Sequence, residues 1–317
     1  MPNIITFSKV HVEDARSLAL ADYSEARAAV LALPHIDEIP LMYYDEFVEN
    51  GLGVALYDGK KMLGFLCCQN PWQHAFGSAA VGTFVPGYAR GAVNQNKENI
   101  YKKLYQAAAE IWTQKGIAYH AISVYAHDAQ ATNAFFALGF GLRCVDAVRP
   151  MSNFDCSTSS EISYRELEKA DVALLRDMRR ALSTHLGESP CFYKMTDEQH
   201  QRWLTRAESR DSRLFAATTG AEIAAFVEVA DDGESFASYQ PSMQNICGAF
   251  CAPEHRGKDI MQGLLNFAIT TLKADGYTSL GVDFESYNLS SNAFWLKYFT
   301  AYNHTVFRRI DECGINF

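Results

Sequence analysis

The sequence predicts a mixed α/β protein in which one domain occurs twice. Along its 317 residues, stretches with apolar residues at helical spacing alternate with short runs typical of strands. This alternation is the pattern of a mixed sheet covered by crossover helices. The tetrapeptide at 133–136, Asn-Ala-Phe-Phe, returns at 292–295 as Asn-Ala-Phe-Trp, about half the chain length further on. A tandem duplication explains both observations.

Each half shows the same order of elements. In the first half we expect an opening helix, a hairpin, a strand, a long helix, a buried strand and a short helix, over residues 13–33, 53–69, 78–85, 97–115, 119–125 and 129–138. The corresponding ranges of the second half are 171–185, 214–229, 246–251, 260–275, 279–284 and 290–298. Gly116 and Gly276 end the long helices, and a last strand closes each half.

The two halves meet in a polar segment. Ser, Thr, Asp and Asn concentrate in residues 153–160, where apolar residues nearly vanish. This composition is typical of a linker, although an ordered connector between strands fits it as well. We therefore predict one domain over 1–155 and a second over 160–317.

The composition argues against several classes of function. The 28 basic and 37 acidic residues give a net charge of −9, which disfavours binding to nucleic acid or to an anionic membrane. No apolar run approaches the roughly 20 residues that span a bilayer, and the N-terminus lacks the features of a secretory signal. The eight cysteines form no CxxC pair and, with the histidines, no zinc spacing. We expect a cytoplasmic protein with reduced thiols and no metal.

The segment from 246 to 265 carries the strongest chemical signal. A strand ends at Cys251, Pro253 interrupts it, and Arg256-Gly257-Lys258 leads directly into a long helix. Backbone N–H groups at a helix N-terminus, together with the helix dipole and two basic side chains, form a site for a diphosphate. Gly257 lets the backbone approach the anion because it has no Cβ.

This order of strand, Pro-Glu-His-Arg-Gly-Lys loop, long helix, strand, asparagine and short aromatic helix resembles the GNAT acyltransferase superfamily. The resemblance covers nearly all of 160–311 and, more weakly, 1–150. It implies two tandem GNAT domains with acetyl-CoA as co-substrate. The loop would hold the pyrophosphate, and the preceding strand would pair with the pantetheine arm. The residues that the resemblance assigns to the cofactor are Phe250, Cys251, Arg256, Gly257, Lys258, Asp259, Ile260, Met261 and Asn288.

Two features depart from the family pattern. Glu254 and Asp259 place carboxylates in the loop, where they repel a phosphate unless they turn outward. The family tyrosine that protonates the departing CoA thiolate would stand seven residues after Asn288, where this chain has Trp295. Tyr298, about one helical turn further on, is our candidate for the general acid, because Trp295 has no proton to give at neutral pH.

Acyl transfer to an amine also needs a base. The candidate carboxylates are Glu228, Asp283 and Glu285. We favour Glu285, because it lies where a strand ends at the sheet edge at which ligands gather. Cys251 has no histidine placed by a motif to activate it, so we assign it a structural role.

The first half departs further from the family. Arg90-Gly91 would be its equivalent loop, a polar insertion at 92–97 would lengthen the turn, and Phe136 takes the tyrosine position. We therefore expect that this half does not bind CoA productively and instead shapes a substrate cleft.

The predicted function is acetyl-CoA-dependent N-acetyl transfer by the second domain to an unidentified small-molecule or peptide amine. One alternative is a non-catalytic acyl-CoA-binding or regulatory protein, which Trp295 and the acidic loop residues favour. The other is an interaction scaffold with a GNAT fold.

Overall fold

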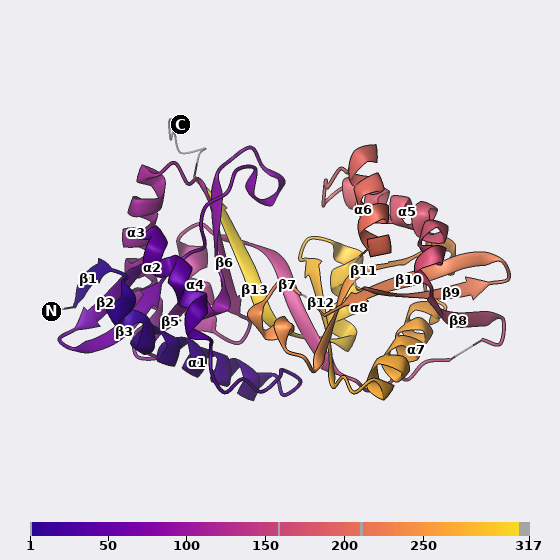
Figure 1. Cartoon of the computed structure of the whole chain (residues 1–317), viewed down its shortest axis with the longest axis horizontal. Helices are drawn as coiled ribbons and strands as arrows, with labels where there is room; N and C mark the ends of the chain where they lie inside the picture. Colours follow the sequence, from indigo (N-terminus) through magenta and orange to yellow (C-terminus); the bar gives the residue numbers. More distant parts are fainter. Residues whose placement is uncertain (1, 158, 210–211, 232, 311–317) are drawn as a thin grey trace. The chain divides into compact units, whose positions relative to one another are not determined.

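The computed structural model describes residues 2–157, 159–209, 212–231 and 233–310 (Figure 1). The chain forms two compact units. Unit 1 consists of residues 1–145, 235–237 and 301–317, and unit 2 of residues 146–234 and 238–300. These units differ from the predicted ranges 1–155 and 160–317, because most of the last strand belongs to unit 1 and the polar connector belongs to unit 2.

Unit 1 contains a four-stranded sheet, with the order β1-β2-β3-β5, and a second group in which β6 pairs in parallel with β4 and antiparallel with β13. The strands are β1 (Asn3–Thr6), β2 (Val54–Asp58), β3 (Lys61–Leu66), β4 (Gly82–Val85), β5 (Arg90–Ala92), β6 (Tyr119–Tyr125) and β13 (Thr300–Arg309). The α-helices are α1 (Val12–Ala29), α2 (Asp45–Asn50), α3 (Lys97–Gln114) and α4 (Ala129–Ala137).

The strands of unit 2 follow the order β7-β12-β11-β10-β9-β8. They are β7 (Gly141–Pro150), which begins in unit 1, β8 (Ile162–Leu167), β9 (Arg213–Thr219), β10 (Glu222–Ala230), β11 (Met243–Cys251) and β12 (Ser279–Glu285). The α-helices are α5 (Arg176–Gly187), α6 (Asp197–Ser209), α7 (Ile260–Ala274) and α8 (Leu289–Tyr298). Among the described helices of both units, none is long and apolar enough to cross a membrane.

The same local features recur in both units. The hairpins β2–β3 and β9–β10 turn at Gly59 and Gly220, whose φ angles are 59° and 60°, and each carries a bulge in its returning strand. The long helices α3 and α7 both follow a residue with positive φ, Asn96 in unit 1 and Asp259 in unit 2. The predicted duplication of one fold is confirmed.

The short helices α4 and α8 also begin in the same way. The side chain of Asp128 accepts a hydrogen bond from the N–H of Ala131, and that of Asn288 accepts one from the N–H of Ser291. Each side chain satisfies an N–H that the first helical turn leaves without a partner. These caps place Asp128 and Asn288 at equivalent positions.

Helices cover both faces of the unit 2 sheet. Figure 1 shows α5 and α6 on one side of β8–β11 and α7 on the other, and α7 contacts β8, β9 and β10. Phe250 belongs to the apolar cluster that also contains Leu204 and Ala207 of α6. Because side chains alternate along a strand, Gly248 and Phe250 face α5 and α6, whereas Ala249 and Cys251 face the other way.

Two sequence expectations are corrected, and one helix was missed. The helix predicted at 171–185 is a 3-10 segment, Lys169–Leu175, followed by α5, and α6 was not predicted. The polar segment predicted as a linker includes an ordered connector. The N–H of Phe154 donates to Oδ1 of Asn266 on α7 at 2.5 Å, and the Phe154 carbonyl accepts from Nδ2 of the same side chain at 3.0 Å.

Candidate functional site

A gap opens in the unit 2 sheet where β11 and β12 separate. The two strands pair in parallel over four residues, and the last pair is Ile246 with Val282. β11 then continues to Cys251 and β12 to Glu285, but no further pair joins them within the described residues. The backbone groups of β11 that would have bonded to β12 therefore face a gap, where a ligand can use them.

A β-bulge marks the start of this gap. On the other side of β11, Ile246 pairs with Val229 and Gly248 with Glu228, so Cys247 is the extra residue. A bulge bends its strand and redirects the backbone groups around it. The bulge at Cys247 directly follows the last pair between β11 and β12, so the position at which the gap opens is set by the bulge.

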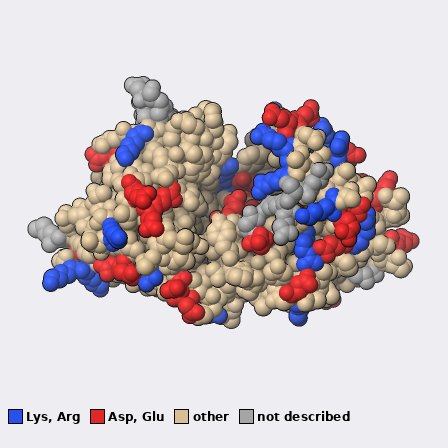
Figure 2. All heavy atoms as spheres, in the orientation of Figure 1, with Lys and Arg blue, Asp and Glu red and all other residues tan. Residues whose placement is uncertain are grey.

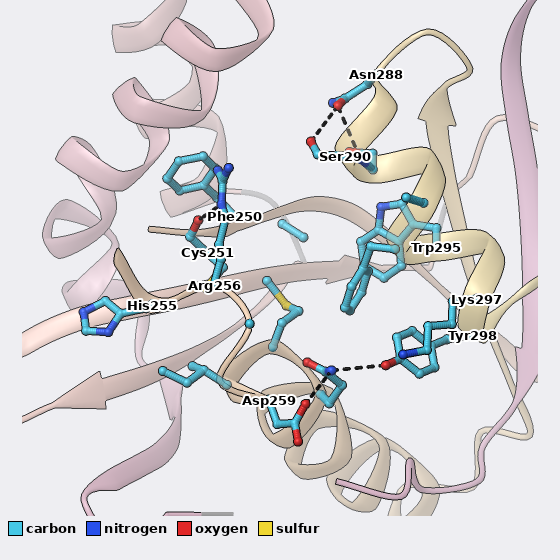
Figure 3. Close-up of a pocket in the computed structure, with 18 of the residues that line it drawn as sticks. Phe250, Cys251, His255, Arg256, Asp259, Asn288, Ser290, Trp295, Lys297 and Tyr298 are labelled. Atoms are coloured by element: carbon cyan, nitrogen blue, oxygen red, sulfur yellow. Dashed lines mark hydrogen bonds between the residues drawn. The ribbon is translucent and has the colours of Figure 1, made fainter. Parts of the chain in front are cut away.

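The loop after β11 leads to the N-terminus of α7. Gly257 has a φ of +73°, and a side chain there would meet no atom within 4 Å, so the backbone conformation and not crowding favours glycine. Nε of Arg256 donates to the Cys251 carbonyl at 3.0 Å, and the guanidinium lies 5.4 Å from the centre of the Phe250 ring. These contacts hold the charge of Arg256 beside the gap (Figure 3).

The carboxylate of Asp259 is engaged away from the first N–H groups of α7. Its Oδ1 accepts from Nε2 of Gln262 at 2.9 Å, and its Oδ2 accepts from the N–H of Ser157 at 3.4 Å. It does not cap α7, and Glu254 is exposed. The N–H groups of the first turn are therefore left for an anion, despite the two acidic residues in the loop.

A cavity of about 410 Å³ occupies the gap and reaches the loop. The predicted site residues that line it are Phe250, Cys251, Arg256, Gly257, Asp259, Ile260, Met261, Asn288 and Tyr298. Lys258 and Glu285 are not among the lining residues, and Lys258 is exposed. The structure thus brings together most of the residues that the sequence assigned to the cofactor.

Helix α8 forms one wall of the cavity. Trp295 is buried, and its ring packs edge-on against Phe294 and Phe299. The hydroxyl of Tyr298 accepts a hydrogen bond from Nε2 of Gln262 at 3.1 Å (Figure 3). Trp295 therefore provides an apolar wall, and Tyr298 provides a phenol that α7 holds in place.

The three candidate bases have different surroundings. Glu285 is half-buried at the end of β12 and does not line the cavity. Burial, followed by repulsion from Glu234, raises the pKa of Asp283 well above its usual range. Glu228 is buried on β10, where its carboxylate accepts from Nε1 of Trp203 at 3.2 Å and from another hydroxyl at 3.1 Å.

Cys251 lines the cavity as a neutral thiol. Burial raises its pKa to about 11, although the positive charge of Arg256 acts in the opposite direction. A thiol with this pKa carries almost no thiolate at neutral pH, and the thiolate is the nucleophile. The environment is consistent with the structural role predicted for Cys251.

Helix α5 contributes residues that the sequence reasoning missed. Leu182 and His185 line the cavity, and Nε2 of His185 lies 3.2 Å from Oγ of Ser290 at the start of α8. No local motif signals this contact, because it joins residues more than a hundred positions apart. Gln262 was also missed, although its spacing of three residues from Asp259 on a helix start favours contact.

In unit 1 the equivalent junction is built differently from what the sequence suggested. Arg90 is part of β5 and pairs with Leu66, as Ala249 of β11 pairs with Val227. The prediction of a loop at Arg90-Gly91 is therefore wrong. Only residues 93–96 join β5 to α3, whereas 252–259 join β11 to α7, so the lengthened turn predicted at 92–97 is wrong too.

Side chains of unit 1 form a buried network at this junction. Nζ of Lys97, the first residue of α3, lies 3.0 Å from Oδ1 of Asp22 and 3.2 Å from Oδ2 of Asp128. The guanidinium of Arg90 is fully buried, donates to the hydroxyl of Tyr101 at 2.7 Å and lies 3.4 Å from Asp22. We call these five residues the buried charge network.

The network stands where unit 2 has its cavity. Strand pairing and helix starts align three of its members, Arg90, Lys97 and Asp128, with Ala249, Ile260 and Asn288 of unit 2. All three of these unit 2 residues line the cavity.

The prediction that Phe136 is the counterpart of Trp295 is wrong by one residue. The caps Asp128 and Asn288 align Trp295 with Phe135, which is buried like Trp295. Phe136 is exposed.

Comparison with known proteins agrees with this geometry. Residues 176–299 match the model of the Acetyltransferase (GNAT) family. The matched residues include the gap, the loop and every residue that lines the cavity. No curated protein sequence matches the chain.

Solved structures with TM-scores above 0.5 show the same fold over almost the full length of this chain. A GCN5-related N-acetyltransferase from Sphaerobacter thermophilus is 12% identical, with a TM-score of 0.60 over 98% of this chain and 96% of that one. The GCN5-related glucosamine N-acetyltransferase region of a fungal multi-domain β-N-acetylglucosaminidase is 14% identical, with a TM-score of 0.51 over 97% of this chain and 38% of that one. A tandem GNAT protein from the clavulanic acid biosynthesis pathway is 13% identical, with a TM-score of 0.46 over 97% of both chains.

Proposed function

We propose that unit 2 transfers an acetyl group from acetyl-CoA to the nitrogen of a small-molecule or peptide amine. The observation that carries this proposal is the gap after Ile246 and Val282, whose cavity reaches the loop at Arg256 and Gly257. A pantetheine arm can bond to the backbone of β11 inside the gap. Its pyrophosphate would then reach the N-terminus of α7, where N–H groups and the helix dipole favour negative charge.

The reaction would proceed by direct attack. The amine nitrogen bonds to the thioester carbonyl carbon, and backbone N–H groups of β11 near the Cys247 bulge stabilise the oxyanion. The carbon–sulfur bond then breaks and CoA leaves as a thiolate. Glu285, the base predicted from the sequence, does not line the cavity and would take the proton that the amine loses through a water molecule. The phenol of Tyr298 gives a proton to the thiolate.

The proposal places one cofactor site in each chain. Arg90, Lys97 and Asp128 of the buried charge network fill the positions that border the cavity in unit 2. A pantetheine arm would have to displace buried charges that are already bonded to one another, which costs several kcal/mol. We therefore expect one molecule of acetyl-CoA per chain.

Calorimetric titration of acetyl-CoA and CoA into the intact protein tests the proposal. Gly257→Glu adds a carboxylate at the loop, and we expect it to weaken binding at least 100-fold. Gly220→Glu is the matched control, because Gly220 also has positive φ and open space around it but lies in the β9–β10 turn. Two sites per chain, or equal binding by the Gly257→Glu variant, would refute the proposed site.

A non-catalytic acyl-CoA-binding protein is the second candidate. Trp295 favours it, because an indole stands where the family places a proton donor. An assay for released CoA thiol, run against a panel of amines, separates the two functions. Binding with release of thiol in the presence of an amine supports the enzyme, and binding without release supports the second candidate.

A further inference from the structure

A half-buried arginine, Arg179 of α5, lies beside β11 at the bulge. An ideal Cβ on Gly248 would be 2.9 Å from Nη1 of Arg179 on α5 and 3.4 Å from Oε2 of Glu228. Gly248 follows the bulge residue directly, so the absence of its side chain leaves room for the guanidinium and the carboxylate at the start of the gap. One positive and one negative group therefore meet on the α5 face of β11.

The guanidinium of Arg179 has few polar partners among the residues that the structure describes. It lies over the ring of Trp203 at 4.8 Å, but it makes no hydrogen bond to any residue that the structure describes, and its Nε is buried. Burial lowers its pKa, although Glu228 acts in the opposite direction. The carboxylate of Glu228 is already bonded to Trp203 and to Ser212. A buried donor without an acceptor is rare in native proteins, so Nε of Arg179 is expected to donate to a water molecule or a ligand.

A small cavity borders this guanidinium. It has a volume of about 40 Å³ and lies between α5 and α6. Its ionisable lining residues are Arg176, Arg179, Arg180, Asp197 and His200. Asp197 accepts from Nη1 of Arg180 at 2.9 Å, and the lining holds three arginines but only this one carboxylate. Figure 2 shows Lys and Arg side chains gathered over this part of unit 2, with Asp and Glu among them.

We propose that this cavity binds a carboxylate of the acceptor, so that the acceptor is an amine with a carboxylate close to its amino group, as in an amino acid. Arg179 is the principal contact, because a guanidinium binds a carboxylate through two parallel N–H bonds. Glu228 faces the ammonium from the other side of the Gly248 position. The proposal rests on the proposed function and names the class of its acceptor.

The cavity is large enough for a carboxylate. Its volume of about 40 Å³ exceeds the roughly 10–15 Å³ that one bound water requires, and a carboxylate is a flat group of three heavy atoms. The bulge at Cys247, where the thioester carbonyl would lie, is the neighbouring residue of Gly248. An amino group one or two bonds from the carboxylate would therefore be near the reacting carbonyl.

Matched ligand pairs test the proposal by binding. The twenty amino acids and their decarboxylated amines, such as lysine with cadaverine, are titrated into the intact protein in the presence of saturating CoA. We expect at least one amino acid to bind 10-fold or more tightly than its amine. Arg179→Met should remove that difference, since a charge-assisted pair contributes roughly 10- to 100-fold. Arg202→Met, a change on α6 outside the cavity lining, is the control and should preserve it.

Further measurements keep the outcomes distinct. Arg179→Lys retains a positive charge and should keep part of the preference for the amino acid over its amine. This variant replaces Arg179→Met as the test if the Met variant does not fold. The dissociation constant of acetyl-CoA should be unchanged in both variants. A weaker acetyl-CoA affinity in Arg179→Met, together with displacement of CoA by inorganic phosphate, would assign the cavity to a cofactor phosphate and overturn the proposal. The absence of any preference for the carboxylated ligands would overturn it as well.

Turnover separates this proposal from the proposed function. Binding of an amino acid without release of CoA thiol would leave the carboxylate site standing and contradict the enzyme. Equal acetylation of an amino acid and its decarboxylated amine would support the enzyme and contradict the carboxylate site.

Discussion

The two units build the same strand-to-helix junction and use it in opposite ways. In unit 2, β11 separates from β12 and leaves a cavity whose lining includes Ala249, Ile260 and Asn288. In unit 1 the aligned positions hold Arg90 and Lys97, with Asp128 as the cap of α4, and their charges are joined through Asp22. The fold thus tolerates either an open gap or a filled one, and a few side chains decide which.

The filled junction has an energetic consequence. Arg90 is fully buried and Lys97 and Asp22 nearly so, so each charge depends on its partners to offset the loss of hydration. Such a network adds little stability when complete but is strongly destabilising when one member is removed. Substitutions at this junction should therefore lower the stability of unit 1 much more than that of unit 2.

Removal of Asp22 is the change with the largest expected effect. Asp22→Ala leaves Lys97 and Arg90 without their shared acceptor, and we expect the free energy of unfolding of unit 1 to fall by about 3–5 kcal/mol. Urea unfolding, with hydrogen exchange followed separately over 100–114 and 260–274, measures it. Asp259→Ala is the control, because this half-buried carboxylate should contribute about 1 kcal/mol or less. Equal losses in both variants would contradict the contrast between the units.

The next largest expected effect is a loss of stability of unit 1 at acid pH. Burial lowers the pKa of His120, in unit 1, to about 4, and the neutral ring lies 2.8 Å from the hydroxyl of Tyr105. Below about pH 6.5, His120 binds a proton in the unfolded chain but not in the folded unit. The contribution of His120 to the free energy of unfolding is therefore fully present above that pH and is lost as the pH falls towards 4. The expected loss is about 3 kcal/mol.

The measurement compares wild type with His120→Gln, which cannot titrate, by urea unfolding at pH 7 and pH 4. Other titrating groups are common to both proteins, so the difference between the two pH dependences isolates His120. Hydrogen exchange should place the extra loss in unit 1. Parallel pH dependences in the two proteins would show that His120 does not carry the effect.

The contrast between the units also explains how far the sequence could lead. The strand, loop and helix from 246 to 265 were predicted because a turn glycine, basic residues and helical periodicity are signals between near neighbours. The pairing of β13 with β6 joins residues nearly two hundred positions apart and leaves no such signal. For the same reason, no local pattern indicates that Arg90 is buried in a strand or that Arg179 approaches Gly248.

The end of helix α8 gives the sharpest test of catalysis within this comparison. The short helix of unit 1 has Leu138 at the position of Tyr298, and Phe135 at that of Trp295, so it offers no proton donor at either place. In unit 2, Tyr298→Phe removes the phenol that faces the cavity. We expect kcat to fall roughly 100-fold, since a positioned acid typically contributes at least that factor, with the acetyl-CoA dissociation constant unchanged. Steady-state release of CoA thiol at saturating acetyl-CoA measures this change.

A second substitution separates catalysis from packing. Trp295→Tyr in the Tyr298→Phe background places a phenol at the position where the family has its tyrosine, in the same cavity wall. If a proton donor is what the Phe variant lacks, this double variant should recover at least 10-fold in kcat. If Tyr298 acts only through its contact with Gln262, the double variant should remain as slow as the single one, because the new hydroxyl stands a helical turn away from that amide. Recovery would identify the acid by its chemistry, and continued loss would remove Tyr298 from the reaction and leave it as a support for α7.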